Sequence, residues 1–81
     1  MGKTYRKLNM HEPAIFRICI QGELDESWFD YFGTQSSLVE IDPSGNPVTT
    51  IICEPMDQAG LIGLVTYLNF LGIPLISVEP V

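Results

Sequence analysis

Few side chains in this 81-residue chain could carry covalent or metal chemistry. Cys19 and Cys53 fall on segments that we expect to be neighbouring strands, so their thiols could lie close together. A zinc site needs several Cys, His or carboxylate ligands, but the chain has no Cys-x-x-Cys spacing and His11 is its only histidine. We therefore expect inert thiols, an exposed His11 and no bound metal or cofactor.

Acidic residues gather around one short segment, at Glu23, Asp25, Glu26 and Asp30. Paired carboxylates can do general acid–base work. Here Asp25 is well placed to cap a helix and Glu26 lies at the positive end of that helix, which leaves the others as a solvated surface. No serine or cysteine nucleophile has a histidine near it in the sequence, so we predict no catalytic residues and the sequence leans against an enzyme.

The net charge of −6 is unevenly distributed. Lys3, Arg6 and Lys7 lie within residues 1–13, whereas beyond them Arg17 is the only base. An acidic body of this kind repels a nucleic-acid backbone, so we expect no nucleic-acid partner. No apolar segment of a signal peptide follows the basic residues, which favours the cytoplasm. We expect a polar tail over residues 1–13 and a single domain over residues 14–81.

The clearest local pattern runs from Asp57 to Val78. Asp57 is a favoured N-cap, and Gly72 followed by Pro74 is typical of a helix end. A short strand, Leu75 to Val78, is expected to follow. Helical spacing places one apolar stripe toward the core, namely Leu61, Leu64, Val65, Leu68 and Leu71.

The opposite side of this helix carries no charged residue. It consists of Ala59, Ile62, Gly63, Thr66 and Phe70, with Tyr67 at its margin. One interpretation is a weakly polar, solvated face; another is an interface, because exposed apolar patches usually mark contacts. The uncharged run over residues 59–78 is also long enough to span a bilayer, but Gly72 and Pro74 interrupt it and no basic cluster flanks it. We expect no membrane span.

The other elements follow from shorter signals. We predict strands over residues 14–21, 37–42 and 48–54, and a short helix over residues 25–32. Asp42-Pro43-Ser44-Gly45 fits a type I turn that joins the second and third strands. The order predicts an α+β, ferredoxin-like βαββαβ fold, with a four-stranded antiparallel sheet, two helices on one face, and the first and third strands in the centre.

The sheet face away from the helices is expected to be rather apolar, whichever side of the third strand faces outward. We interpret it as a second possible interface, with Ile15, Cys19 and Ile51 as candidates beside Ile62, Gly63, Tyr67 and Phe70. A solvated sheet that tolerates a few apolar groups is the alternative.

Two strings in the sequence resemble a group of short bacterial proteins without an assigned activity. They are a Q-G-x-L-D-x-S-W opening, residues 21–28, and a D-Q-A-x-L … L-G-x-P-L-x-S-V close, residues 57–61 and 71–78. The second string is also similar to ACT-type regulatory domains. In those domains, however, it follows the first strand, so the resemblance implies shared supersecondary structure and not the ACT amino-acid site.

Two functional hypotheses follow from the sequence. The first is a small homo-oligomeric interaction or regulatory module, with itself or another protein as partner. The second is a sensor of small amino-acid-like or aromatic molecules, or less readily an enzyme. Its pocket would lie by the first helix or at a subunit interface, with Trp28, Tyr31, Asp57 and Gln58 as lining candidates.

Overall fold

Six elements follow one another in a computed structural model of the chain, which describes residues 11–25 and 27–81. Residues 1–10 of the expected tail lie outside this description, as do the side chains of Phe29, Tyr31 and Phe32. The elements are β1 (Phe16–Gln21), α1 (Ser27–Phe32), β2 (Thr34–Ile41), β3 (Pro47–Cys53), α2 (Gln58–Phe70) and β4 (Leu75–Pro80).

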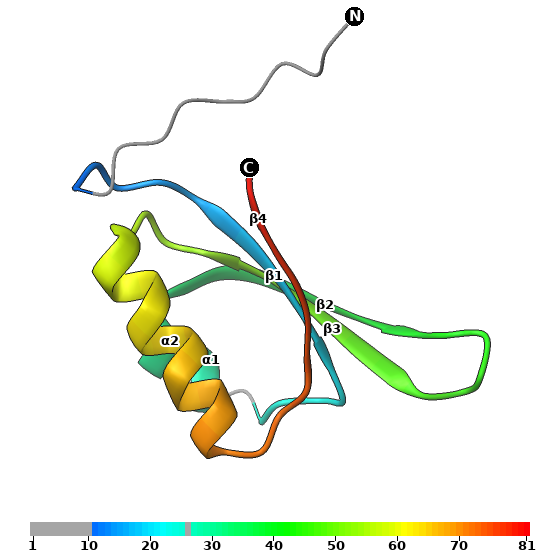
Figure 1. The fold of residues 1–81 in the computed structure, drawn as a ribbon. Helices are drawn as coiled ribbons and strands as arrows, with labels where there is room; N and C mark the ends of the chain where they lie inside the picture. Colours follow the sequence, from blue (N-terminus) through cyan, green and yellow to red (C-terminus); the bar gives the residue numbers. More distant parts are fainter. Residues whose placement is uncertain (1–10, 26) are drawn as a thin grey trace, which may run out of the picture.

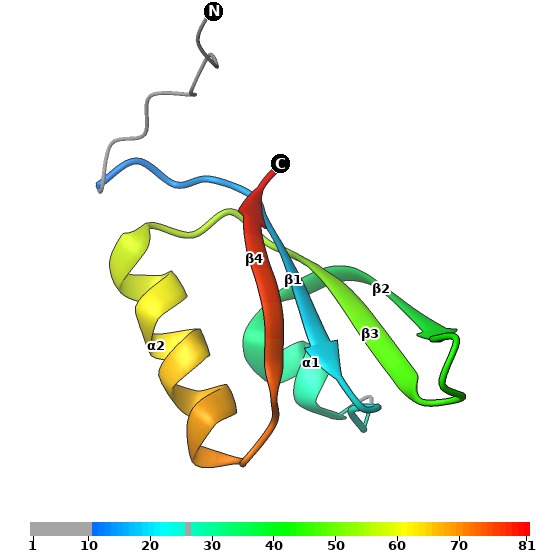
Figure 2. The same cartoon turned by 45° about the vertical axis from the view of Figure 1, so that its right-hand side comes forward.

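The strands form one antiparallel sheet in the order β2-β3-β1-β4. The prediction that the first and third strands lie in the centre is confirmed. Figures 1 and 2 show α2 running along one face of this sheet, with α1 on the same side. The opposite face carries no helix in the part of the chain that is described.

The turn between β2 and β3 forms as its sequence predicts. The Gly45 N–H donates to the Asp42 carbonyl at 2.9 Å, which closes a four-residue turn. The Asp42 carboxylate also accepts from the Ser44 and Asn46 N–H groups, both at 2.9 Å. Gly45 has a φ of 86°, a conformation that glycine adopts without steric cost.

Both ends of α2 are closed by the residues that the sequence indicates. Asp57 accepts a hydrogen bond from the Gly60 N–H at 2.8 Å. At the other end Gly72 has a φ of 74°. Its N–H donates to the Asn69 carbonyl, and the Ile73 N–H donates to the Leu68 carbonyl, both at 3.0 Å. These two bonds are a Schellman motif, so the helix ends by a fully local signal.

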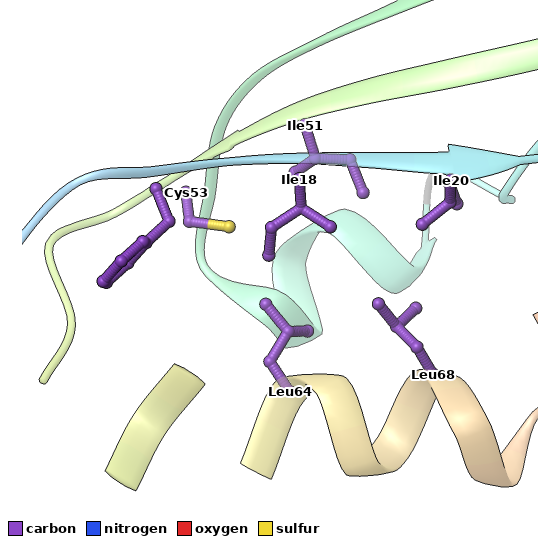
Figure 3. Packing of buried hydrophobic residues seen from close by; sticks show 7 residues of the cluster. Ile18, Ile20, Ile51, Cys53, Leu64 and Leu68 are labelled. Atoms are coloured by element: carbon purple, nitrogen blue, oxygen red, sulfur yellow. The ribbon is translucent and has the colours of Figure 1, made fainter. Parts of the chain in front are cut away.

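The core lies between α2 and the two central strands. Leu64 and Leu68 of α2 point toward Ile18 and Ile20 of β1, as Figure 3 shows, and Leu68 is only 1% exposed. Among the side chains that the structure describes, the buried hydrophobic residues are Phe16, Ile18, Ile20, Ile51, Cys53, Leu64 and Leu68. Of the predicted inner stripe, Leu64 and Leu68 therefore lie in the core and Leu61 and Leu71 pack against it, whereas Val65 is only half-buried.

The prediction of a ferredoxin-like fold is wrong, because the sheet is covered by one full helix and not two. The segment that should supply the first helix gives only α1, six residues or about 9 Å long. Gly33, with a φ of 66°, stops the chain there and returns it to the sheet. In consequence β2 extends beyond the helices, as Figure 1 shows for the hairpin with β3.

Candidate functional site

The exposed side of α2 is the first candidate surface. Phe70 is 82% exposed and Ile62 is 56% exposed, although both are large apolar side chains. Ala59, Gly63 and Thr66 are exposed beside them. Helical spacing places these residues on one stripe, opposite the core stripe that contains Leu64 and Leu68. A helix that is apolar on both sides is normally covered on both sides, so this stripe is a candidate contact surface.

Aromatic rings extend from this stripe toward α1. The Tyr67 ring lies 5.7 Å from the Trp28 ring, tilted by 54°, and 6.3 Å from the Phe70 ring, stacked within 27°. A shallow depression of about 450 Å³ opens beside them, lined by Gly63, Thr66, Tyr67 and Phe70. We call these four residues and Ile62 the α2 patch. The lining of the depression is almost entirely apolar, so it suits apolar or aromatic material.

Three of the four residues predicted to line a ligand pocket, Trp28, Asp57 and Gln58, do not line this depression. Trp28 packs against the core and touches Tyr67 from behind. Asp57 uses its carboxylate to cap α2, and Gln58 is exposed in the first turn. Ten residues of helix, about 15 Å, separate Asp57 from Tyr67. The side chain of Tyr31 lies outside the described part of the chain.

The open face of the sheet is the second surface that the sequence indicated. Strand register places Leu38, Thr50, Cys19 and Ser77 in one row across all four strands on this face. The Thr50 hydroxyl lies 3.9 Å from the Cys19 sulfur, and Cys19 is half-buried, as is Ile15 at the start of β1. The face is more polar than the α2 patch, since its other rows hold Arg17, Glu40 and Glu79.

Ile51 does not belong to this face and needs correction as an interface candidate. It is 1% exposed and lies in the core beside Ile18. The inward side of β3 is set by Thr49, which is fully buried and donates its hydroxyl to the Gly22 carbonyl at 2.7 Å. Because side chains alternate along a strand, Ile51 and Cys53 turn inward with Thr49.

The free edge of β2 is a surface that sequence reasoning missed. Leu38, Val39 and Ile41 are 58, 40 and 66% exposed; Val39 and Ile41 lie on one face of the sheet and Leu38 on the other. The sequence signal was present, because the strand combines these residues with neither lysine nor proline. It was overlooked because a second helix was expected to cover the inner side of this strand.

Electrostatic features of the described residues give little support to catalysis. Burial raises the pKa of the Cys53 thiol, which keeps it protonated and unreactive at neutral pH. Hydrogen bonds from Ser27 lower the pKa of the exposed Asp25 carboxyl, as its capping position requires. Within residues 11–25 and 27–81, no three His, Cys, Asp or Glu side chains gather as metal ligands would.

Comparison with known proteins places the chain in a family. Residues 15–79 match a family described as a domain of unknown function, DUF8691. The chain belongs to this DUF8691 family. This confirms the expectation that the chain belongs to a family without an assigned activity. The match does not confirm the two sequence strings as marks of that family, and it gives no support to the similarity with ACT-type domains.

The DUF8691 assignment covers nearly all of the folded domain but names no activity. No curated protein matches the chain significantly, and neither does any solved structure. In the described residues, neither helix is long and apolar enough to cross a membrane. The evidence for function therefore lies in the exposed surfaces of the domain itself.

Proposed function

We propose that this DUF8691 domain is a self-association module that joins two copies through the α2 patch. The single observation that carries the proposal is the 82% exposure of Phe70 on a helix side that has no charged residue. An aromatic ring this exposed, beside Ile62 at 56% exposure, gains free energy when another apolar surface covers it.

The patch is complementary to itself about a two-fold axis. When two α2 helices pack antiparallel with the axis between Thr66 and Tyr67, residue 63 of one copy faces residue 70 of the other. Gly63 has open space on this side, because a Cβ placed there would meet no atom within 4 Å. Phe70 of each copy can therefore lie over Gly63 of the other, in the knob-into-hole manner of packed helices.

Charge favours the same arrangement. From Gln58 to Phe70 the helix has neither acidic nor basic residues. Two copies that meet through this helix therefore bring no like charges together and remove no charged side chain from water. The chain as a whole carries −6, and an uncharged patch is the part of such a molecule that a second copy can approach most readily. A cytoplasmic setting belongs to this proposal, supported by the free thiols of Cys19 and Cys53.

Sedimentation equilibrium of wild type and Phe70→Ala tests the proposal. Burying one phenylalanine contributes about 1.5–3 kcal/mol, and a symmetric dimer loses two. The dissociation constant of the α2 contact should therefore rise at least about a hundredfold. Wild-type protein that stays at 9.0 kDa at all concentrations would refute self-association.

Two substitutions of Gly63 give a matched control. Gly63→Ala and Gly63→Leu both improve helix propensity by nearly the same amount, but only leucine fills the space assigned to Phe70. We expect the alanine variant to associate like wild type and the leucine variant to associate weakly. Combining Gly63→Leu with Phe70→Ala exchanges the large and small residues, and should recover part of the lost affinity.

The depression beside Tyr67 supports a second candidate function, binding of a small aromatic or apolar molecule. Its volume of about 450 Å³ lies in the range of ligand pockets. Fluorescence of Trp28, the only tryptophan, reports on this region because its ring touches Tyr67. Aromatic amino acids and free nucleobases should change that fluorescence and dissociate the dimer. A screen in which none does either would remove this candidate.

A further inference from the structure

The two edges of the sheet are protected to different degrees. On β4, Pro80 lacks an N–H and a register shift interrupts the pairing with β1 beside Ile20. Both features discourage the addition of another strand. On β2 the register is regular from Ser36 to Ile41, and this run contains no proline or lysine. The β2 edge is therefore the one that can accept a strand.

Hydrogen bonds at the hairpin show which backbone groups of β2 face outward. The Asp42 N–H donates to the Asn46 carbonyl at 2.8 Å, and bonded pairs alternate along an antiparallel ladder. Pro47, the partner of Ile41, turns its carbonyl away from β2 and accepts from the Gly22 N–H at 2.8 Å. Ile41 is therefore not hydrogen-bonded to β3, and by the alternation every second residue before it is not either. The N–H and C=O groups of Ser37, Val39 and Ile41 consequently point to the free edge of the sheet.

The side chains on this edge are uncovered for a reason that lies in the fold. Val39 pairs with the buried Thr49 and Ile41 pairs with Pro47, so both lie on the helix side of the sheet. A second full helix would cover them, but α1 ends after six residues. They remain 40 and 66% exposed, and Leu38 on the opposite face is 58% exposed.

We propose that β2 pairs with β2 of a second copy, antiparallel about a two-fold axis at Leu38, to form one eight-stranded sheet. In this register Leu38 faces Leu38 of the other copy, and each Glu40 faces a Ser36. The outward backbone groups of Ser37 meet those of Val39 in the second copy, as the alternation requires. No like charges oppose each other, whereas a register shifted by two residues would set Leu38 against Glu40.

This surface is distinct from the α2 patch, so its test is made in the Phe70→Ala variant. We expect Phe70→Ala alone to sediment as a dimer, held by β2, and Phe70→Ala with Leu38→Lys to sediment as a 9.0 kDa monomer. Leu75→Lys supplies the matched control, because Leu75 is 41% exposed on the other edge strand and should leave the dimer intact. A Phe70→Ala protein that is monomeric at the highest soluble concentration overturns the β2 contact.

A charge exchange tests the register. In the Phe70→Ala background, Leu38→Lys and Leu38→Glu each place like charges opposite one another and should each be monomeric, with urea unfolding confirming that both are folded. An equimolar mixture should restore the dimer, because lysine then faces glutamate. If Leu38→Lys alone strengthens the dimer, the lysine faces Glu40 and the proposed register is overturned. Failure of the α2 contact is recognised separately, by a Phe70→Ala variant that associates as strongly as wild type.

Discussion

Leu68→Ala should cost this domain a large share of its stability, and the structure sets the size of the loss. Leu68 is 1% exposed and points toward Ile20 (Figure 3), so its truncation leaves a cavity in the core. Buried Leu→Ala changes cost about 2–5 kcal/mol. Domains have about 0.05–0.15 kcal/mol of stability per residue, or about 4–12 kcal/mol for a chain of this length. We therefore expect between about a sixth of the stability and all of it to be lost.

Urea unfolding followed by circular dichroism measures this loss, best in the Phe70→Ala, Leu38→Lys background, which we expect to be monomeric, so that neither proposed contact contributes. A slope of about 1 kcal/mol per molar urea, the low end for small domains, moves the midpoint down by about 2 M or more. Ile62→Ala is the control, since this residue is 56% exposed on the same helix and its loss should cost about 0.5 kcal/mol or less. Equal losses for the two variants would refute the assignment of inner and outer stripes.

Three further predictions concern other residues. Gly72→Ala should lose about 1–2 kcal/mol in urea unfolding, because the φ of 74° strains any other residue while a Cβ there meets no neighbour; an unchanged midpoint would contradict this. Burial raises the pKa of Cys53 above its ordinary 9.0, so the folded state holds the thiol proton more tightly than the unfolded state does. The contribution of this thiol to the free energy of unfolding is therefore intact below about pH 9 and should fall as the pH rises further. The Cys53→Val variant, which has no thiol at this position, should not show this fall. Iodoacetamide should alkylate the half-buried Cys19 in the folded protein, but should alkylate the buried Cys53 only at the rate of global unfolding. Peptide mass mapping measures the two alkylation rates, and equal rates would contradict the burial of Cys53.

Local signals in the sequence were enough to predict the ends of α2 and the hairpin turn. The Asp57 cap, the Gly72 stop and the turn at Asp42 each depend on hydrogen bonds within a few residues, so residue type and spacing determine them. The exposed stripe with Phe70 was predictable for the same reason, since helical periodicity fixes which residues share a side.

The errors concern contacts between distant parts of the chain. Both sides of β3 look alike in sequence, whereas in the structure Thr49, Ile51 and Cys53 face inward and the Thr49 hydroxyl donates to the Gly22 carbonyl. That is why Ile51 was placed among the surface candidates. The exposure of Val39 and Ile41 depends likewise on how much of the sheet the neighbouring helix covers, which the pattern of β2 itself does not contain.

The unequal edges of the sheet limit how far it can grow. Pairing through β2 uses the open edge of each copy and leaves β4 at both outer borders of the joined sheet. Those borders carry Pro80 and an interrupted register, which resist the stacking of further strands that leads to cross-β fibrils. The joined sheet therefore stops at eight strands, even though each copy exposes Leu38, Val39 and Ile41 on its β2 edge.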